Sequence, residues 1–145
     1  MKVVVQRVGS SHVSVAGKPV GKIDSGLVLL VGFTASDTID IINYMVKKVV
    51  NLRIFPDEAG VMNKSILDYG GQILSVSQFT LYGDATKGNR PSYIKAAKNE
   101  IAKPMYDKFN KLLREYVNVE TGVFGADMEV SITNIGPTTI LLEKE

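Results

Sequence analysis

The stretch Leu27-Val28-Leu29-Leu30-Val31-Gly32-Phe33 is continuously apolar apart from its one glycine. A short apolar run of this kind is typical of a central strand in a sheet. Two further stretches predict strands: residues 2–7, which are rich in valine, and residues 72–78, which carry three large aliphatic side chains. We therefore expect a sheet at the core of the molecule, with residues 27–33 as its central strand.

Two long helices are predicted by apolar residues that recur every three or four positions. The first helix follows an N-cap in Ser36-Asp37 and runs to about Asn51. The second covers residues 99–116, and Pro104 is expected near its first turn, where a missing N–H group is tolerated. Shorter strands are predicted at residues 11–15, 20–23, 52–55, 119–123, 128–134 and 138–142, and loops at residues 56–71 and 83–91.

These elements predict the fold class. A chain of 145 residues has the usual size of one domain, so residues 1–145 are expected to form a single domain. Grouped strands together with two long helices favour an α/β sandwich over a regular doubly wound sheet.

The composition excludes several classes of function. The chain has no cysteine and one histidine, so we expect neither a cysteine nucleophile nor a thiolate metal site. The common protease, esterase, ATPase and dinucleotide motifs are absent as well. The longest apolar run is far too short to span a bilayer, and the first residues do not form a signal-peptide core. We expect a soluble, cytoplasmic protein without a metal or another cofactor.

Positive charge is concentrated in one part of the chain. Residues 85–114 carry eight lysines and arginines against two carboxylates, a local net charge of +6, although the net charge of the whole chain is only +2. Such a segment fits a surface that meets phosphates. A solvated helix with lysines on its outer face would give the same pattern, and charge alone does not separate these two interpretations.

Two polar motifs follow or interrupt predicted strands. In Leu74-Ser75-Val76-Ser77-Gln78-Phe79-Thr80-Leu81-Tyr82, a buried strand runs into two hydroxyls and an amide. Beside backbone N–H groups, these side chains are the components of an oxyanion site, although ordinary polarity at the edge of a sheet gives the same pattern. In Asn134-Ile135-Gly136-Pro137-Thr138-Thr139, the proline breaks strand pairing, as it also would in a simple β-bulge or turn.

Taken together, the two motifs make the chain resemble the D-aminoacyl-tRNA deacylases, which remove wrongly attached D-amino acids from tRNA. The first motif is similar to the serine-glutamine-phenylalanine-threonine element of that family, and the second to its asparagine-any-glycine-proline element. The resemblance covers nearly the whole chain. It includes Gln6-Arg7-Val8, Arg53-Ile54-Phe55, Met62-Asn63, Lys87-Gly88-Asn89-Arg90-Pro91-Ser92, Thr121-Gly122-Val123-Phe124 and Ala126-Asp127-Met128.

The resemblance implies a three-layer α/β fold, with mixed or antiparallel sheets, and a homodimer whose active sites lie at the interface. It implies that the Gly136-Pro137 peptide bond is cis and reaches into the partner's pocket, where its carbonyl groups reject L-amino acids. The substrate would be the acceptor end of aminoacyl-tRNA, and the ribose 2′-hydroxyl would assist hydrolysis. Glycine, which has no side chain to reject, would be accepted too.

The same resemblance implies roles for individual residues. Ser77, Gln78, Phe79 and Thr80 would form the catalytic motif that surrounds the ester and the terminal adenosine. Phe124 and Met128 would wall the pocket, and Arg7 would orient the Gly136-Pro137 segment. The chain departs from the family at Thr138, where valine is usual. Two alternatives to D-specific hydrolysis remain: a deacylase with relaxed chirality, and a tRNA-binding module without activity.

Overall fold

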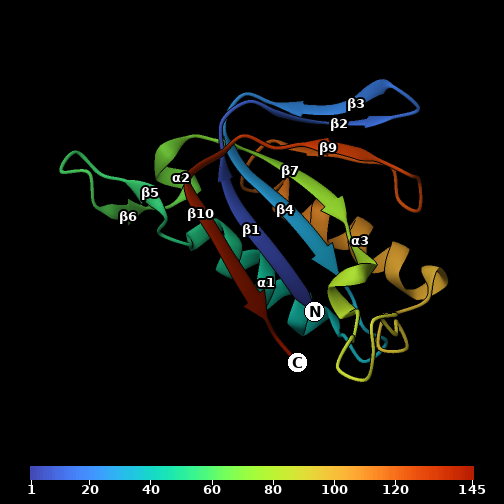
Figure 1. Ribbon diagram of the computed structural model, residues 1–145. Coiled ribbons are helices and arrows are strands. Elements are labelled where there is room, and N and C mark those ends of the chain that lie inside the picture. The colour runs from blue at the N-terminus through green and yellow to red at the C-terminus, as the bar shows by residue number, and fades with distance from the viewer.

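The computed structural model describes residues 1–145 and contains a five-stranded mixed sheet at its centre (Figure 1). The strand order is β10-β1-β4-β7-β8. Strand β4 (Gly26–Gly32) lies in the middle, antiparallel to β1 (Lys2–Val8) and parallel to β7 (Gln72–Ser77). The apolar run at residues 27–33 is therefore the central strand, as predicted.

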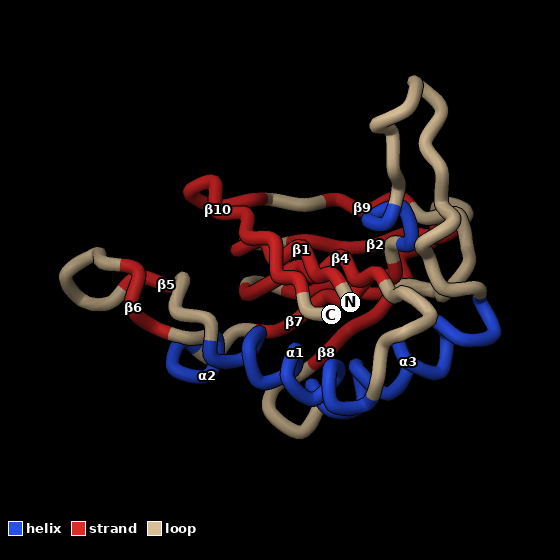
Figure 2. Tube along the Cα trace, turned by 90° about the horizontal axis from the view of Figure 1, so that it is seen from below, coloured by secondary structure: helices blue, strands red, loops and turns tan.

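The molecule has three layers, and the five-stranded sheet that contains β4 is the middle one (Figure 2). This confirms the expected α/β arrangement. The helices α1 (Ile39–Asn51) and α3 (Asn99–Leu113) cover one face of the five-stranded sheet. A small sheet of β3 (Lys18–Ile23), β2 (Ser11–Val15) and β9 (Glu129–Ser131) covers the other.

Side chains of β4 alternate between two apolar cores. Leu27, Leu29 and Val31 belong to the larger core under the helices, and Val28 belongs to the smaller core between the sheets. Because successive side chains of a strand point to opposite faces, a strand buried on both faces must be apolar throughout. This double burial is the physical reason for the uninterrupted apolar run.

The start of α1 differs from the prediction. The N-cap is Thr38, whose side chain accepts a hydrogen bond from the Ile41 amide at 3.3 Å, and not Ser36-Asp37. Asp37 is buried and bonds instead to the amino group of Met1 at 2.6 Å and to the Thr34 amide at 2.9 Å. A contact across 36 positions thus removes the carboxylate that local sequence favours as a cap.

The position of Pro104 also differs. Helix α3 begins at Asn99, so Pro104 is its sixth residue and lies in the second turn rather than the first. The proline leaves the carbonyl of Glu100 without its helical partner. Both residues are exposed, so water can satisfy that carbonyl, and the helix continues to Leu113, three residues short of the predicted end.

The predicted loop at residues 56–71 contains regular structure. Strand β5 (Phe55–Pro56) pairs with β6 (Met62–Lys64), and a short helix α2 (Ile66–Tyr69) follows with a Ser65-Asp68 capping box. The strand predicted at residues 52–55 is consequently shorter and shifted. Near the C-terminus, β8 (Val119–Thr121) and β9 are shorter than predicted, and β10 (Asn134–Glu143) is longer.

None of the helices combines the length and the apolar character that crossing a membrane requires.

Gly26 gives a test of the pairing between β4 and β7. Its φ is +140°, and a Cβ atom there would overlap the backbone of Gln72, to which it is paired. We expect Gly26→Ala to lower the free energy of unfolding by at least about 3 kcal/mol. In the matched control Gly60→Ala, φ is also positive but the space is open, so only about 1–2 kcal/mol should be lost. Urea denaturation measures both, and equal losses would contradict this explanation.

Candidate active site

The first predicted motif lies where β7 ends. Ser77 is the last residue of the strand, paired with Val31 of β4, and the Gln78 amide donates the next hydrogen bond to the Val31 carbonyl at 2.7 Å. The chain then turns into a 3₁₀ helix, η1 (Phe79–Tyr82). Because β4 and β7 are parallel, their carboxyl ends meet at the same edge of the sheet, and the motif side chains gather there.

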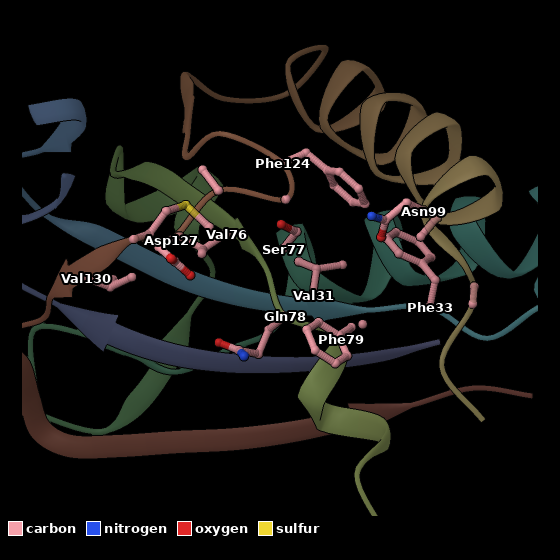
Figure 3. Close-up of a pocket in the computed structure, with 16 residues that line it drawn as sticks. Val31, Phe33, Val76, Ser77, Gln78, Phe79, Asn99, Phe124, Asp127 and Val130 are labelled. Carbon is pink, nitrogen blue, oxygen red and sulfur yellow. The ribbon is translucent and has the colours of Figure 1, made fainter. Parts of the chain in front are cut away.

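A pocket of about 290 Å³ opens at this edge (Figure 3). Its walls come from the ends of β4 and β7, the start of α3 and the segment that joins β8 to β9. The lining is mainly apolar and consists of Val31, Gly32, Phe33, Val76, Ser77, Gln78, Phe79, Ala97, Asn99, Ala102, Phe124, Gly125, Ala126, Asp127, Met128 and Val130.

Five of the predicted site residues line this pocket: Ser77, Gln78, Phe79, Phe124 and Met128. Figure 3 shows Phe124 on the α3 side of the pocket and Gln78 and Phe79 on the opposite side. Three segments that are far apart in the sequence thus line one cavity.

Thr80 does not line the pocket. Its hydroxyl oxygen accepts a hydrogen bond from the Gln78 side-chain amide at 2.5 Å. A nucleophilic hydroxyl needs a neighbouring base that takes its proton, and here the neighbour is a donor. In this geometry the Thr80 hydroxyl contacts the Gln78 side chain and has no basic side chain as a hydrogen-bond partner.

The Phe124 wall is held in place by α3. Tyr106 packs against the Phe124 ring, with 5.8 Å between ring centroids, and its hydroxyl donates to the Ser75 carbonyl at 2.7 Å. Burial raises the pKa of the Tyr106 hydroxyl, an effect that its hydrogen bonds oppose. Tyr106 is neutral at physiological pH, so it ties α3 to β7 directly behind the pocket.

Charged groups are scarce in the pocket. Asp127 is the one charged side chain of the lining, and no histidine, lysine or arginine contributes to it. Sequence reasoning did not assign Asp127 or Asn99 to the site. Asp127 stands beside Met128 in one of the stretches that carry the family resemblance, which was its only signal. Asn99 gave none, because only the fold places the start of α3 against the end of β7.

The second motif lies at the other end of the sheet. Strand β10 pairs with β1 at Gln6–Thr139 and again at Val8–Asn134, so four residues of β10 bulge out opposite Arg7. The bulge contains the Gly136-Pro137 peptide bond, which is cis as expected, and residues 135–137 are exposed. Proline thus interrupts the pairing, as predicted, within one long edge strand.

Arg7 holds this bulge from the side of β1. Its guanidinium donates to the Ile135 carbonyl through Nε at 3.3 Å and Nη2 at 3.2 Å, and to the Ile54 carbonyl through Nη1 at 2.7 Å. The bulge is therefore fixed to the segment that leads into β5. These contacts place Arg7 next to Gly136-Pro137, and its role in orienting that segment stays a prediction.

Asn134 holds the bulge from within. Its Oδ1 accepts from the Thr138 amide at 3.0 Å, and its Nδ2 donates to the Thr139 hydroxyl at 2.9 Å. One side chain thus bridges both ends of the Gly136-Pro137 segment. Thr138 is nearly buried, so its amide has little access to water as an alternative partner.

Replacing Asn134 should loosen the bulge. We expect Asn134→Ala to lower the free energy of unfolding by about 1–3 kcal/mol, because a buried amide loses its acceptor. Hydrogen exchange at Thr138 should accelerate, with the Ala97 amide, which bonds to Phe33, unchanged. Asn51→Ala, at an exposed helix end, is the matched control. Unchanged exchange at Thr138 would show that Asn134 does not hold the bulge.

Comparison with known proteins finds similar chains that align with this one along nearly its whole length. A D-aminoacyl-tRNA deacylase from Anoxybacillus flavithermus (strain DSM 21510 / WK1) is 55% identical over 100% of both chains. One from Thermus aquaticus is 54% identical over 99% of this chain and 95% of its own. A solved structure described as a c-Myc DNA unwinding element binding protein is 42% identical, with a TM-score of 0.95, and covers 100% of this chain and 99% of its own.

A more distant structure shares the fold. It is described as a probable eukaryotic D-amino acid tRNA deacylase and is 19% identical, with a TM-score of 0.84 over 97% of both chains. Residues 4–143 match the family described as D-Tyr-tRNA(Tyr) deacylase. With the motif pocket, the Gly136-Pro137 bulge and a family match along almost the whole chain, the protein belongs to the D-Tyr-tRNA(Tyr) deacylase family.

Proposed function

We propose that this protein hydrolyses the ester bond between a D-amino acid and the terminal ribose of tRNA, releasing the free D-amino acid and tRNA. The observation that carries this proposal is the pocket at the end of β7, which is built from the family's first motif. Relatives at 54% and 55% identity bear the name of this activity, and they align along essentially the whole chain.

The pocket fits an aminoacyl ester attached to a nucleoside. Phe124 and Met128 supply an apolar wall for the amino-acid side chain. Phe79 lines the pocket and is 56% exposed, so it offers a ring face at the rim on which the terminal adenine stacks. The site thus separates an apolar interior for the amino acid from an aromatic rim for the base.

The chemistry assigned here uses the substrate's own groups. Water adds to the ester carbonyl carbon, the bond to the ribose oxygen breaks, and that oxygen leaves with a proton. As the family resemblance implies, the neighbouring ribose 2′-hydroxyl assists this proton transfer, and a pocket whose one ionisable side chain is Asp127 is consistent with that role. The amides of Phe79 and Thr80 open η1 without carbonyl partners, and they are the donors proposed to stabilise the oxyanion.

The chirality filter is proposed to come from a second copy of the chain. Val31, beside the pocket, pairs with Val3 of β1, whereas the bulge lies opposite Arg7. Four residues of an extended strand separate these positions by about 13 Å. The Gly136-Pro137 segment of one copy therefore does not serve its own pocket, and a two-fold axis that reverses the sheet brings it to the pocket of the other.

Two features of β10 support such a homodimer. The strand lies at the edge of the sheet, where its outer backbone groups have no partner strand. It also exposes apolar side chains: Ile135 is 46% and Leu141 is 55% exposed. An edge of this kind is suited to an interface with a second copy, which would cover both features.

Selectivity in this proposal comes from rejection. The backbone carbonyls of Gly136 and Pro137, fixed by Arg7 and Asn134, accept hydrogen bonds from the amino group of a D-aminoacyl ester. An L-amino acid in the same orientation directs its side chain against these carbonyls and is excluded. Glycine has nothing to exclude, so glycyl-tRNA is a substrate as well.

Hydrolysis of matched D- and L-aminoacyl-tRNA tests the proposed activity. We expect release of D-tyrosine and of glycine from tRNA, at least about 100-fold faster than release of L-tyrosine, because steric rejection by rigid backbone costs several kcal/mol. The rate should not change with EDTA. Intact D-tyrosyl-tRNA after prolonged incubation would refute the activity, and similar D and L rates would indicate a deacylase with relaxed chirality.

Mixed dimers test the origin of the filter. Ala126→Trp fills the pocket, and Gly136→Ala distorts the bulge, because φ is +118° and a Cβ atom would lie 2.7 Å from Arg7 Nη2. Each variant alone should be inactive. Co-refolded in equal amounts, they should recover about a quarter of the wild-type rate, since half of the dimers have one intact site. No recovery in mixtures shown to contain the mixed dimer would contradict a filter supplied by the partner.

A second candidate function is nucleic-acid binding without hydrolysis. The exposed basic residues after η1 favour it, and one of the similar structures is named as a DNA-binding protein. This candidate requires no pocket, so it leaves the apolar cavity and its motif without a role. The hydrolysis assay separates the two functions, because binding alone leaves the ester intact.

A further inference from the structure

The loop between η1 and α3 lies next to the pocket and is rich in cationic side chains. It spans residues 83–98 and carries four cationic side chains, Lys87, Arg90, Lys95 and Lys98, against one carboxylate, Asp84. All four cations are exposed, and none forms a salt bridge. The loop contains half of the eight cations in the basic segment and presents them without salt-bridge partners.

Asp84 offsets only one of these four positive charges. Its carboxylate accepts hydrogen bonds from the amide of Thr86 at 3.0 Å and from its hydroxyl at 2.7 Å. The bond from the Thr86 amide is the largest cause that keeps the pKa of Asp84 low. The one acidic group of the loop shapes the turn, and four cations against one carboxylate leave the loop a net charge of +3.

The loop is fixed in position at both ends. Asp84 and Ser92 exchange two backbone hydrogen bonds of 2.8 Å, the Thr34 hydroxyl donates to the Lys95 carbonyl at 2.7 Å, and the Ala97 amide donates to Phe33. The ring of Tyr93 packs edge-on against Phe79, with 5.1 Å between centroids. A charged surface held in this way loses little conformational entropy when it binds a partner.

The anchors of the loop are also walls of the pocket. It begins directly after η1, which contains Phe79, and it ends at Ala97 and Lys98, next to Asn99. In Figure 1 it is the yellow loop that extends beyond the carboxyl ends of β4 and β7. A nucleotide chain that leaves the pocket on this side therefore passes the loop.

None of the lysines of α3, in the second half of the basic segment, lines the pocket. Asn99 and Ala102 face the pocket from α3. At about 100° per residue, Lys108 lies about 180° and Lys111 about 120° around the helix from Asn99. Lys103 is paired with Asp107 at 2.7 Å. The two interpretations of the basic segment thus apply to different halves: a solvated helix face after residue 99, and a phosphate-facing loop before it.

We propose that loop 83–98 binds the backbone phosphates of the tRNA acceptor end, immediately before the terminal nucleotide, through Lys87, Arg90, Lys95 and Lys98. The exposed side chains of Tyr93 and Ile94, which is 92% exposed, lie among these cations and offer apolar contact to unpaired bases. This proposal rests on the proposed function. It adds that tRNA is held by a preformed surface at the mouth of the pocket.

The test compares the double variant Lys87→Ala/Arg90→Ala with the matched control Lys108→Ala/Lys111→Ala. Two substrates are used: D-tyrosyl-tRNA, and D-tyrosyl-adenosine, which has no phosphate. The loop variant should lose about tenfold or more in kcat/KM on tRNA, and its logarithmic salt slope should flatten by about two units. It should hydrolyse D-tyrosyl-adenosine at the wild-type rate, and the control variant should match wild type on both substrates.

Binding of uncharged tRNA, followed by fluorescence anisotropy, tests the surface independently of hydrolysis. The loop variant should bind about tenfold or more weakly than wild type, and the control variant should bind equally well. Equal losses in the two variants, or no loss in the loop variant, would overturn the proposal. Failure of the wild-type protein to cleave either ester would refute the proposed function instead, and the binding comparison would still decide the role of the loop.

Discussion

The parallel pairing of β4 with β7, buried on both faces, is the constraint on which the rest of the structure depends. Helices cover one face of β4 and a second sheet covers the other. A shift of β4 by one residue would move its side chains to the wrong faces, so its position and register are fixed. Parallel strands end at the same edge, so β7 delivers Ser77 and Gln78 beside Val31, and the last backbone hydrogen bond, from Gln78 to Val31, fixes where the strand stops. The pocket is the space beyond that point.

The antiparallel neighbours of β4 explain why the two family motifs lie apart. Strand β1 runs opposite to β4, so Arg7 and the bulge it holds stand at the end of the sheet away from the pocket. A site that needs both motifs then needs two copies of the chain, which is the arrangement proposed here. In that proposal the bulge supplies backbone carbonyls, held by Arg7 and Asn134, that would discriminate by shape and not by side-chain chemistry.

The pocket contains few ionisable groups, whereas the neighbouring loop 83–98 carries several cations. The pocket has mainly apolar walls and one carboxylate, Asp127, and in the proposed function its backbone donors position the ester. The cations that favour a nucleic acid stand on the neighbouring loop, anchored to the same walls through Phe79 and Ala97. In the proposals made above, the loop attracts tRNA electrostatically and the adjacent pocket orients the ester.

The sequence by itself determined the central strand, both long helices and the two motifs, because burial on both faces, helical spacing and the Gly-Pro interruption each leave a local pattern. It placed the N-cap of α1 and Pro104 wrongly, and it missed α2, β6 and the pocket residues Asn99 and Asp127. Only the tertiary structure decided these points, since Asp37 bonds to Met1 across 36 positions, and Asn99 lines the same pocket as Ser77 because α3 packs on the sheet. The spacing of apolar residues within a segment shows which face of a helix or strand is buried. It does not show which other element packs against that face, because that depends on contacts between segments far apart in the sequence.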